Sequence, residues 1–498
     1  MMRPSRLVLW IIVLGAVLRL YGLGSESLWL DEATTARRVG MAYGALFTDA
    51  GNGSQLPLYF WISKLWCGMA GTSEFALRLP AALFGILGIL MIYHLGRKLF
   101  TQPAGIWGAF FAAVNPYLIH YSQEARPYTL LALLAMISWY YMLHLFHDFR
   151  LKDAVGYIIS TAAVLYTHPL GLLILFTHLA GLFIFRRSPG YRAARHSLRQ
   201  ILITAGVTVL LYVPLVFRLF AQFSLKLEGT SVANWIQAPG FIKLFSTAIG
   251  YFMNPWLGVI ALTVATLAAV FRSLSDRKAQ PAVLFCLAVY VGFVAIPWLL
   301  SVTITPLFVE RYTIPFLPML LIVLGWAVAG FEMIPRRVLV AILLVLTVIP
   351  IFNYHTKLDK TPWREGGQYL SGKLRSGDLL IWDPGWNDQI GDYYFKLPGG
   401  VDNLYVYKDT MIQPALDKAQ RIWLIIPGAG NFGMKHVIET DPRASWQLIS
   451  TKNINDGFTC DPHAINLTDL NLTLYEKTAV INEAKPDSLS ISTEDSGS

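Results

Sequence analysis

The chain has 498 residues, of which 55% are hydrophobic and only 14% are charged, and its mean hydropathy is +0.49. Because soluble domains carry about 25% charged residues, this composition excludes an ordinary soluble protein. It predicts a polytopic α-helical membrane protein in a lipid bilayer. The net charge of +9 does not indicate nucleic-acid binding, because residues 1–353 hold 26 Lys and Arg against 12 Asp and Glu, whereas residues 354–498 hold 14 against 19. The basic excess lies in the apolar part, where it sets membrane topology.

Eleven apolar runs approach the roughly 20 residues that a helix needs to cross a bilayer. The first follows Met1–Arg6, and no small-residue cleavage site comes after it, so we predict an uncleaved helix rather than a signal peptide. The predicted spans are 7–24, 78–95, 103–119, 127–147, 153–168, 171–186, 200–219, 248–271, 281–300, 312–331 and 337–353.

Basic residues predict the orientation of these spans. With the N-terminus inside, the inner segments carry 16 Lys and Arg, and the outer segments before the C-terminal domain carry 8. This asymmetry follows the positive-inside rule. We therefore predict a multi-pass protein of the bacterial cytoplasmic (inner) membrane with an extracytoplasmic C-terminal domain. Residues 57–71 number only fifteen, with Lys64 in the middle, and are expected to form an interfacial or re-entrant helix within the first outer loop, 25–77.

The composition changes near Tyr354. Residues 1–353 are predicted to form the transmembrane catalytic domain, residues 354–480 a small α/β domain, and residues 481–498 a disordered polar tail. The elements expected in the α/β domain are helices at Trp363–Leu374 and Gln413–Ala419 and strands at Asp378–Trp382, Leu404–Tyr407 and Ile422–Ile426. The three cysteines show neither a disulfide framework nor metal-ligand spacing.

The rare polar residues of the membrane part gather on the predicted outer side. Asp31 and Glu32, two adjacent carboxylates, follow the first span directly, and a carboxylate at a membrane boundary is a functional-site hypothesis by default. Arg and Lys can hold an anionic head group, and a carboxylate can act as a base. The other candidates on this side are Tyr59, Lys64, Arg78, Glu124, Arg126, Tyr128, His168, Arg311 and Tyr312.

Each of these residues also has a purely structural interpretation. The acidic pair could begin a helix, Arg78 could extend its guanidinium to the membrane surface, and Glu124 with Arg126 could form an ordinary loop ion pair. The placement of all of them on one side of the membrane, rather than any single residue, carries the hypothesis.

Four stretches of the chain resemble the bacterial branch of the GT-C membrane glycosyltransferases. More closely, the chain resembles glycosyltransferase family 39-like proteins, which are related to protein O-mannosyltransferases and the lipid A aminoarabinose transferase. One departure is that the family's His-Pro-Pro-Leu-Tyr-Tyr is replaced here by Gln55–Phe60. The matching stretches are Leu30–Ala33, Phe75–Gly85, Ser122–Tyr128, and Arg311-Tyr312 with the later Trp363-Arg364-Glu365.

The resemblance implies a polyprenyl-phosphate-linked sugar as donor, Asp31 as the catalytic carboxylate with Glu32 beside it, and Arg78 near the donor phosphate. Arg126, Arg311 and Lys64 are further candidates for phosphate binding. The candidates for substrate binding are Tyr59, Glu124, Tyr128, His168 and Tyr312. An inverting displacement with Asp31 as general base needs no enzyme-linked intermediate. No cofactor is implied, and the sequence leaves dependence on a divalent metal open.

Two other classes of function are compatible with this composition. A transporter or flippase of lipid-linked sugars would carry charged residues in mid-membrane or broken helices in paired halves, and neither pattern is visible here. A catalytically inactive GT-C scaffold subunit is the second alternative. The acceptor, a cell-envelope glycolipid, polysaccharide or protein, is not identified by the sequence.

Overall fold

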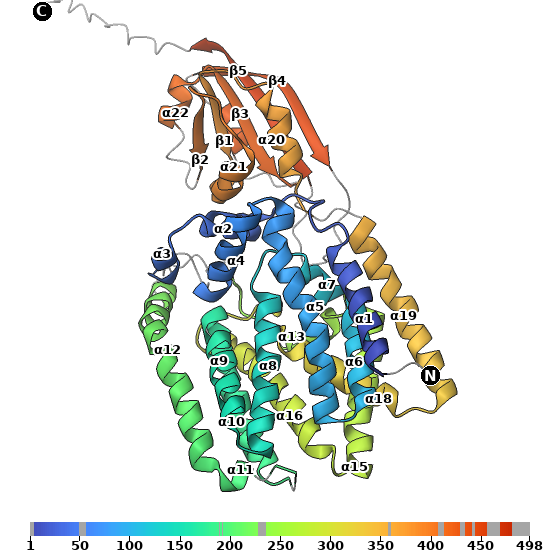
Figure 1. Ribbon diagram of the computed structural model, residues 1–498. Helices are drawn as coiled ribbons and strands as arrows, with labels where there is room; N and C mark the ends of the chain where they lie inside the picture. Colours follow the sequence, from blue (N-terminus) through green and yellow to red (C-terminus); the bar gives the residue numbers. More distant parts are fainter. Residues whose placement is uncertain are drawn as a thin grey trace, which may run out of the picture. The chain divides into compact units, whose positions relative to one another are not determined.

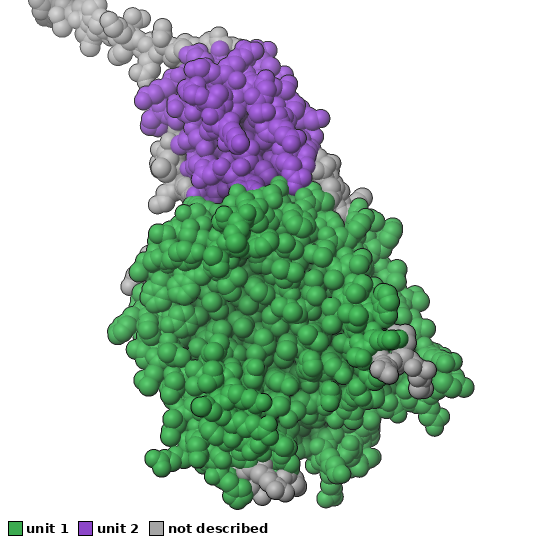
Figure 2. All heavy atoms as spheres, in the orientation of Figure 1, with its two compact units in different colours: residues 1–26, 31–357 green, residues 27–30, 358–498 purple. Residues whose placement is uncertain are grey.

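The computed structural model describes residues 4–48, 56–188, 190–191, 193–227, 236–356, 360–406, 413–428, 434–440, 444–455 and 469–480. The chain divides into two compact units (Figure 2). The first comprises residues 1–26 and 31–357, and the second comprises residues 27–30 and 358–498. The second unit therefore begins a few residues later than the expected boundary at residue 354. It also includes a short piece of the first loop, which sequence analysis did not anticipate.

Helices make up the first unit (Figure 1). Its N-terminal half consists of α1 (Pro4–Leu20), α2 (Leu30–Val39), α3 (Tyr43–Thr48), α4 (Pro57–Ala70), α5 (Glu74–Leu99), α6 (Gln102–Val114), α7 (Pro116–Ser122), α8 (Tyr128–His147) and α9 (Leu151–Thr167). The second half consists of η1 (Pro169–Leu172), α10 (Leu173–Phe185), α11 (Ala193–His196), α12 (Leu198–Leu227), α13 (Lys243–Gly250), α14 (Pro255–Leu267), η2 (Ala268–Arg272), α15 (Ser273–Ser275), α16 (Gln280–Tyr290), η3 (Val291–Ala295), α17 (Ile296–Thr303), η4 (Glu310–Thr313), α18 (Phe316–Ala329) and α19 (Met333–Thr356).

Every predicted span overlaps a helix, but the count of eleven membrane crossings is not confirmed. Among the described residues, six helices are long and apolar enough to cross a membrane by length and composition, and two further apolar helices are shorter. The helix α4 has 14 residues, which at about 1.5 Å per residue gives roughly 21 Å. That length is short of the ~30 Å hydrocarbon core, so the prediction that residues 57–71 do not cross the membrane is retained.

The predicted span 103–119 is broken in two at Asn115. The Asn115 side chain accepts a hydrogen bond from the Leu118 amide at 2.9 Å and so caps α7, whose first residue is Pro116. Asn at the N-cap followed by Pro at the first helical position is a strong helix-start signal. The apolar run is therefore continuous in sequence but bent in the fold.

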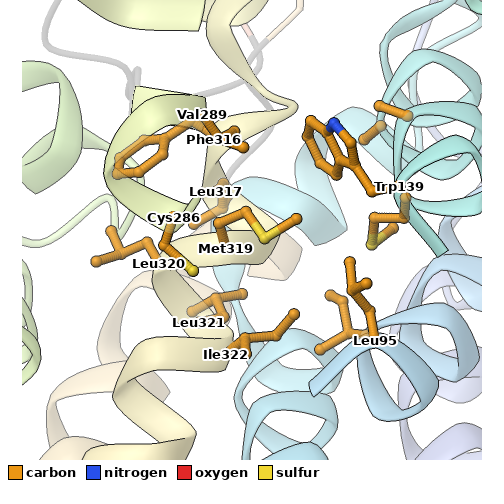
Figure 3. Packing of buried hydrophobic residues seen from close by; sticks show 14 of the residues in the cluster. Leu95, Trp139, Cys286, Val289, Phe316, Leu317, Met319, Leu320, Leu321 and Ile322 are labelled. Atoms are coloured by element: carbon orange, nitrogen blue, oxygen red, sulfur yellow. The ribbon is translucent and has the colours of Figure 1, made fainter. Parts of the chain in front are cut away.

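The centre of the first unit is an apolar core around α18, which packs against α6, α14 and α16. The helix α18 is buried along almost its whole length, as expected of a helix that is apolar on every side. Figure 3 shows Leu317 and Met319 of α18 together with Cys286 of α16, Trp139 of α8 and Leu95 of α5.

A fully buried arginine joins α1 to the end of α6, and sequence analysis did not single it out. Arg19 donates to the carbonyls of Ala112 (2.9 Å), Ala113 (3.0 Å) and Gly15 (3.1 Å), and its Nε donates to Ser122 Oγ at 3.2 Å. The last carbonyls of a helix lack intrahelical partners, and inside a membrane they must be satisfied by protein. Arg19 therefore caps α6.

The second unit contains a five-stranded mixed sheet of order β2-β1-β3-β5-β4. Strand β1 pairs in parallel with β2 and β3, and β5 pairs antiparallel with β3 and β4. The elements are α20 (Trp363–Ser371), β1 (Asp378–Trp382), η5 (Gly385–Asn387), α21 (Asp388–Tyr394), β2 (Asp402–Tyr405), α22 (Gln413–Lys418), β3 (Arg421–Pro427), α23 (Met434–Glu439), β4 (Ala444–Asn455) and β5 (Asp469–Val480).

The three expected strands correspond to β1, β2 and β3, with β2 beginning two residues earlier than expected. Position 407 and the tail 481–498 lie outside the described residues. Sequence analysis missed β4 and β5. The hydrophobic signal of β4 is weak because this strand lies at the edge of the sheet and carries exposed residues such as Leu448. Strand β5 lies between β3 and β4 and carries buried leucines at alternate positions, Leu470, Leu472 and Leu474, a strand pattern that sequence analysis overlooked.

The predicted topology can be tested by cysteine labelling in intact cells. Ser371 is an exposed residue at the end of α20, and Ser371→Cys in a background with Cys460→Ser should react with a membrane-impermeant maleimide before the cells are opened. Ser275→Cys, an exposed position in a predicted inner loop, is the matched control and should react only afterwards. The opposite labelling pattern would contradict the predicted orientation.

Candidate active site

Asp31 and Glu32 lie in the first turn of α2, where the positive end of the helix dipole favours carboxylates. Successive helical residues point about 100° apart, so the two side chains enter different surroundings. The Glu32 side chain is fully buried, whereas the Asp31 side chain is 25% exposed. The adjacent carboxylates therefore cannot have the same role.

Glu32 forms a bidentate ion pair with Arg78 of α5. Arg78 Nε donates to Glu32 Oε1 and Arg78 Nη2 donates to Glu32 Oε2, both at 2.8 Å. Arg78 Nη1 donates to the carbonyls of Leu23 (3.0 Å) and Glu26 (2.9 Å), and the Ala125 amide donates to Glu32 Oε1 at 2.9 Å. The ion pair therefore connects α2 and α5 with the segment that follows α1 and with the loop before α8.

The contacts of Arg78 do not favour its expected role at the donor phosphate. Its side chain is only 2% exposed and its guanidinium binds Glu32 and backbone carbonyls. A paired and buried guanidinium of this kind holds the fold together rather than presenting its fork to a phosphate. Glu32 is likewise occupied by Arg78 and Ala125, which favours a structural role over a catalytic one.

Asp31 lies between two other arginines. Its Oδ2 is 3.6 Å from Arg126 Nη2 and 3.6 Å from Arg311 Nη2. Arg126 Nη1 also donates to the Asp31 backbone carbonyl at 3.0 Å, which fixes the guanidinium against the start of α2. Burial lowers the pKa of Arg126, but Asp31 and Tyr128 more than offset this and raise the pKa above its ordinary value, so the side chain stays charged.

Aromatic and imidazole rings surround the second arginine. Arg311 Nε donates to Tyr128 Oη at 2.9 Å, and the Arg311 guanidinium lies 5.6 Å from the centroid of the Tyr312 ring. The rings of Tyr312 and His168 lie 4.7 Å apart. Five of the predicted site residues are therefore neighbours of Asp31 or of one another: Arg126, Tyr128, His168, Arg311 and Tyr312.

His168 is buried between the end of α9 and η1. Its Nδ1 accepts a hydrogen bond from the Leu170 amide at 3.2 Å, so the proton of the neutral ring is on Nε2. The ring can offer a hydrogen-bond donor but no charge.

Lys64 and Tyr59 make contacts with other residues. Lys64 donates to the Val39 carbonyl at 3.1 Å and lies over the Tyr43 ring, and these contacts do not favour phosphate binding by Lys64. Tyr59 is fully buried in an apolar cluster with Phe60 and Leu46. Its hydroxyl has no hydrogen-bond partner among the residues that the structure describes.

Glu124 pairs with a histidine that sequence analysis did not select. His120 Nε2 lies 3.2 Å from Glu124 Oε1, and the two residues are four positions apart. The i,i+4 spacing of His120 and Glu124 in the sequence could have indicated that the two side chains meet. The described part of the chain contains no group of three or more His, Cys, Asp or Glu residues that could hold a metal ion.

Comparison with known proteins agrees with this fold. Residues 54–220 match the family model described as dolichyl-phosphate-mannose-protein mannosyltransferase. ArnT from Cupriavidus metallidurans in the apo state is similar in structure over 94% of this chain and 98% of that chain, with 14% identity and a TM-score of 0.60. The chain therefore shares the fold of ArnT, and the family model covers residues 54–220 of the chain.

Two further similar structures are complexes with a lipid phosphate. ArnT from the same organism bound to undecaprenyl phosphate matches over 94% of this chain and 97% of that chain, with 14% identity and a TM-score of 0.58. The oligosaccharyltransferase AglB from Archaeoglobus fulgidus, in complex with an inhibitory peptide and a dolichol-phosphate, matches over 84% of this chain and 69% of that chain, with 11% identity and a TM-score of 0.54. No curated protein sequence matches the chain.

The structural role of Arg78 leads to a stability prediction. Removing one partner of a buried ion pair leaves an uncompensated charge and costs about 3–5 kcal/mol, so Arg78→Ala should lower the melting temperature in detergent strongly. Arg78→Ala combined with Glu32→Ala should be more stable than the sum of the single changes predicts, as a thermal-shift double-mutant cycle would measure. Lys64→Ala, which removes a half-buried cation bonded to one carbonyl, serves as the control with a small effect. A folded Arg78→Ala protein of normal stability that has lost only donor affinity would restore the phosphate-binding role.

Proposed function

We propose that the protein transfers a sugar from a polyprenyl-phosphate donor to an acceptor of the cell envelope, with Asp31 as general base. The GT-C fold and the mannosyltransferase family match support the reaction class. The lipid phosphates bound to ArnT and AglB support the donor class. The donor would enter from the bilayer, and a multi-pass protein with apolar helices gives its lipid chain an environment.

The observation that carries the proposal is the difference between the two carboxylates. Glu32 is buried and held by Arg78, while Asp31 is partly exposed beside Arg126 and Arg311. A base must reach the proton of its substrate, and among the two neighbours only Asp31 is accessible. Arg311 is also partly exposed, at 19% of its side chain, so a substrate phosphate can approach it.

The reaction follows from these positions as a single displacement. The acceptor hydroxyl gives its proton to the Asp31 carboxylate while its oxygen forms a bond to the anomeric carbon of the sugar. The bond between that carbon and the phosphate oxygen breaks, and polyprenyl phosphate leaves as an anion. Fixed guanidinium groups, here Arg311 and Arg126, lower the barrier by stabilising the charge that develops on the leaving group. Attack opposite the leaving group inverts the anomeric centre.

The base assignment predicts a selective loss of turnover. Asp31→Asn keeps the shape of the side chain but removes its basic oxygen, and loss of a general base typically costs about 10²–10⁴ in rate. Turnover is measured as release of polyprenyl phosphate from a labelled polyprenyl-phosphate sugar in detergent, and the melting temperature should stay near that of the wild type. Retention of more than about a tenth of the wild-type turnover would contradict the assignment. A transporter would leave the donor intact in this assay.

The phosphate assignment predicts an effect on donor use at position 311. Arg311→Ala should raise the KM for the donor and lower turnover, and Arg311→Lys should rescue only in part because a point charge replaces a planar fork. Arg97→Ala, an exposed arginine near the other end of α5, is the control and should behave as the wild type. Unchanged donor kinetics in Arg311→Ala would remove this residue from the site.

The acceptor can be identified in cells. Mass spectrometry of envelope glycans, lipids and proteins from a deletion strain, complemented with the wild type or with Asp31→Asn, should show one sugar missing from one class of acceptor in the deletion strain. The Asp31→Asn strain should show the same deficit. Normal glycans in the Asp31→Asn strain would contradict the assignment of Asp31 as the general base.

A further inference from the structure

The turn that carries Arg311 is a short and weakly stabilised element. It is the 3-10 helix η4, Glu310–Thr313, in which the Tyr312 amide donates to the Val309 carbonyl at 2.9 Å. Hydrogen bonds in a 3-10 helix have poorer geometry than those in an α-helix, and the Val309 side chain at the N-cap has no polar group that could cap the turn. The position of the Arg311 guanidinium therefore depends on contacts from outside η4.

Tyr251 holds the last residue of this turn. Tyr251 and Thr313 are both fully buried, and the Tyr251 hydroxyl donates to the Thr313 carbonyl at 3.1 Å. The same hydroxyl hydrogen-bonds Thr313 Oγ1, which itself donates to the Glu310 carbonyl at 2.6 Å and so closes the turn. The Tyr251 backbone is fixed as well, because its carbonyl accepts from Asn115 Nδ2 at 3.1 Å. Leaving a buried carbonyl without its donor is costly, so this buried contact is the stronger of two anchors on η4.

Lys243 holds the first residue of the turn. Lys243 Nζ donates to Glu310 Oε1 at 2.5 Å. The two side chains are 32% and 26% exposed, so this ion pair is expected to contribute less than the buried bond of Tyr251. Lys243 is the first residue of α13 and Tyr251 directly follows its last. The two ends of α13 therefore contact the two ends of η4.

The helix α13 is itself held against its neighbours. A Cβ on Gly258 of α14 would lie 2.5 Å from the Ile249 carbonyl oxygen, so glycine at this position lets α14 approach α13 closely. The Tyr290 hydroxyl of α16 donates to the Leu244 carbonyl at 2.9 Å. Contacts from α14 and α16 therefore fix the helix that positions both anchors.

We propose that Tyr251, with a smaller contribution from Lys243, is a positioning residue for Arg311. This inference rests on the proposed function, because it concerns the arginine that would bind the donor phosphate in that reaction. Arg311 lies between the two anchored residues of η4. A misplacement of about 1 Å can cost on the order of 100-fold in rate, so the two anchors act on donor use through Arg311 without contacting the substrate.

The test is a double-mutant cycle between Tyr251 and Arg311. Tyr251→Phe keeps the ring but removes the hydroxyl that donates to Thr313, so kcat/KM for a labelled polyprenyl-phosphate sugar should fall about 10- to 100-fold. The same change in an Arg311→Ala background should cause no further loss, because the hydroxyl acts through the arginine. A merely structural role would lower kcat/KM by the same factor in both backgrounds. That result, or normal kcat/KM in Tyr251→Phe, would overturn the inference.

Tyr157→Phe of α9 is the matched control. It removes another buried tyrosine hydroxyl, one that hydrogen-bonds His178 Nδ1 at 2.8 Å. This variant should lower the melting temperature in detergent but keep the donor kinetics of the wild type. A loss of kcat/KM in Tyr157→Phe as large as that in Tyr251→Phe would count against positioning and overturn the inference.

A second pair of variants decides the matter where Tyr251→Phe does not fold. Lys243→Met and Glu310→Met each break the ion pair at the partly exposed anchor. Each should lower kcat/KM by roughly 2- to 5-fold, with no further loss when the two changes are combined. Wild-type kinetics in both single variants would overturn the inference. A gain in donor affinity in Glu310→Met would also overturn it, because Lys243 would then bind the phosphate itself.

Arg311→Ala distinguishes this inference from the proposed function. Impaired donor kinetics in Arg311→Ala, with normal kinetics in the Tyr251 and Lys243 variants, would remove this inference alone. Normal donor kinetics in Arg311→Ala would remove the proposed phosphate site and the inference with it.

Discussion

The buried ion pair of Glu32 and Arg78 is the constraint on which the candidate site depends. Two charges that leave water together require close geometry and full hydrogen bonding to offset their desolvation. Here the guanidinium makes two bonds to the carboxylate and two to backbone carbonyls, and the carboxylate also accepts the Ala125 amide. Because the Glu32 side chain points toward Arg78, the side chain of the preceding residue, Asp31, points about 100° away from that direction around the helix axis. The orientation of Asp31 toward Arg126 is a consequence of where Glu32 is held.

The loop before α8 is fastened to the same helix by three successive contacts. The Ala125 amide donates to Glu32, the Thr35 hydroxyl donates to the Ala125 carbonyl at 2.8 Å, and Arg126 donates to the Asp31 carbonyl. Each contact uses a different residue of α2, so the loop cannot shift along the helix without breaking all of them. These contacts of the loop backbone hold Arg126 next to Asp31. This arrangement preorganises a cation next to the carboxylate before any substrate is bound.

Composition and run length located the helices because each is a long apolar stretch with few charges. The same scarcity of charge identified Asp31, Arg126 and Arg311 as site candidates, since a membrane protein rarely places ionisable groups without a partner. The sequence could not tell which carboxylate meets which arginine. Arg78 is 46 residues from Glu32, and only the packing of α2 against α5 decides that these two pair while Asp31 faces Arg126. The sequence also could not predict the partner of Lys64, because its side chain donates to the Val39 backbone carbonyl, and every residue has such a carbonyl.

Polar side chains within the apolar helices distinguish this site from a transport pathway. In α8, α9 and α10, the His178 ring hydrogen-bonds Ser138 through Nε2 at 3.1 Å and Tyr157 through Nδ1 at 2.8 Å, so both ring nitrogens are satisfied. Arg19 similarly directs its donors at backbone carbonyls and Ser122. Groups satisfied in this way hold helices together and offer little to a passing substrate. The partly exposed charges lie instead in the loops and helix starts around Asp31 and Arg311. Partly exposed charges at this place, with His178 and Arg19 committed to structural contacts, fit the proposed sugar transfer better than a transporter with a mid-membrane binding site.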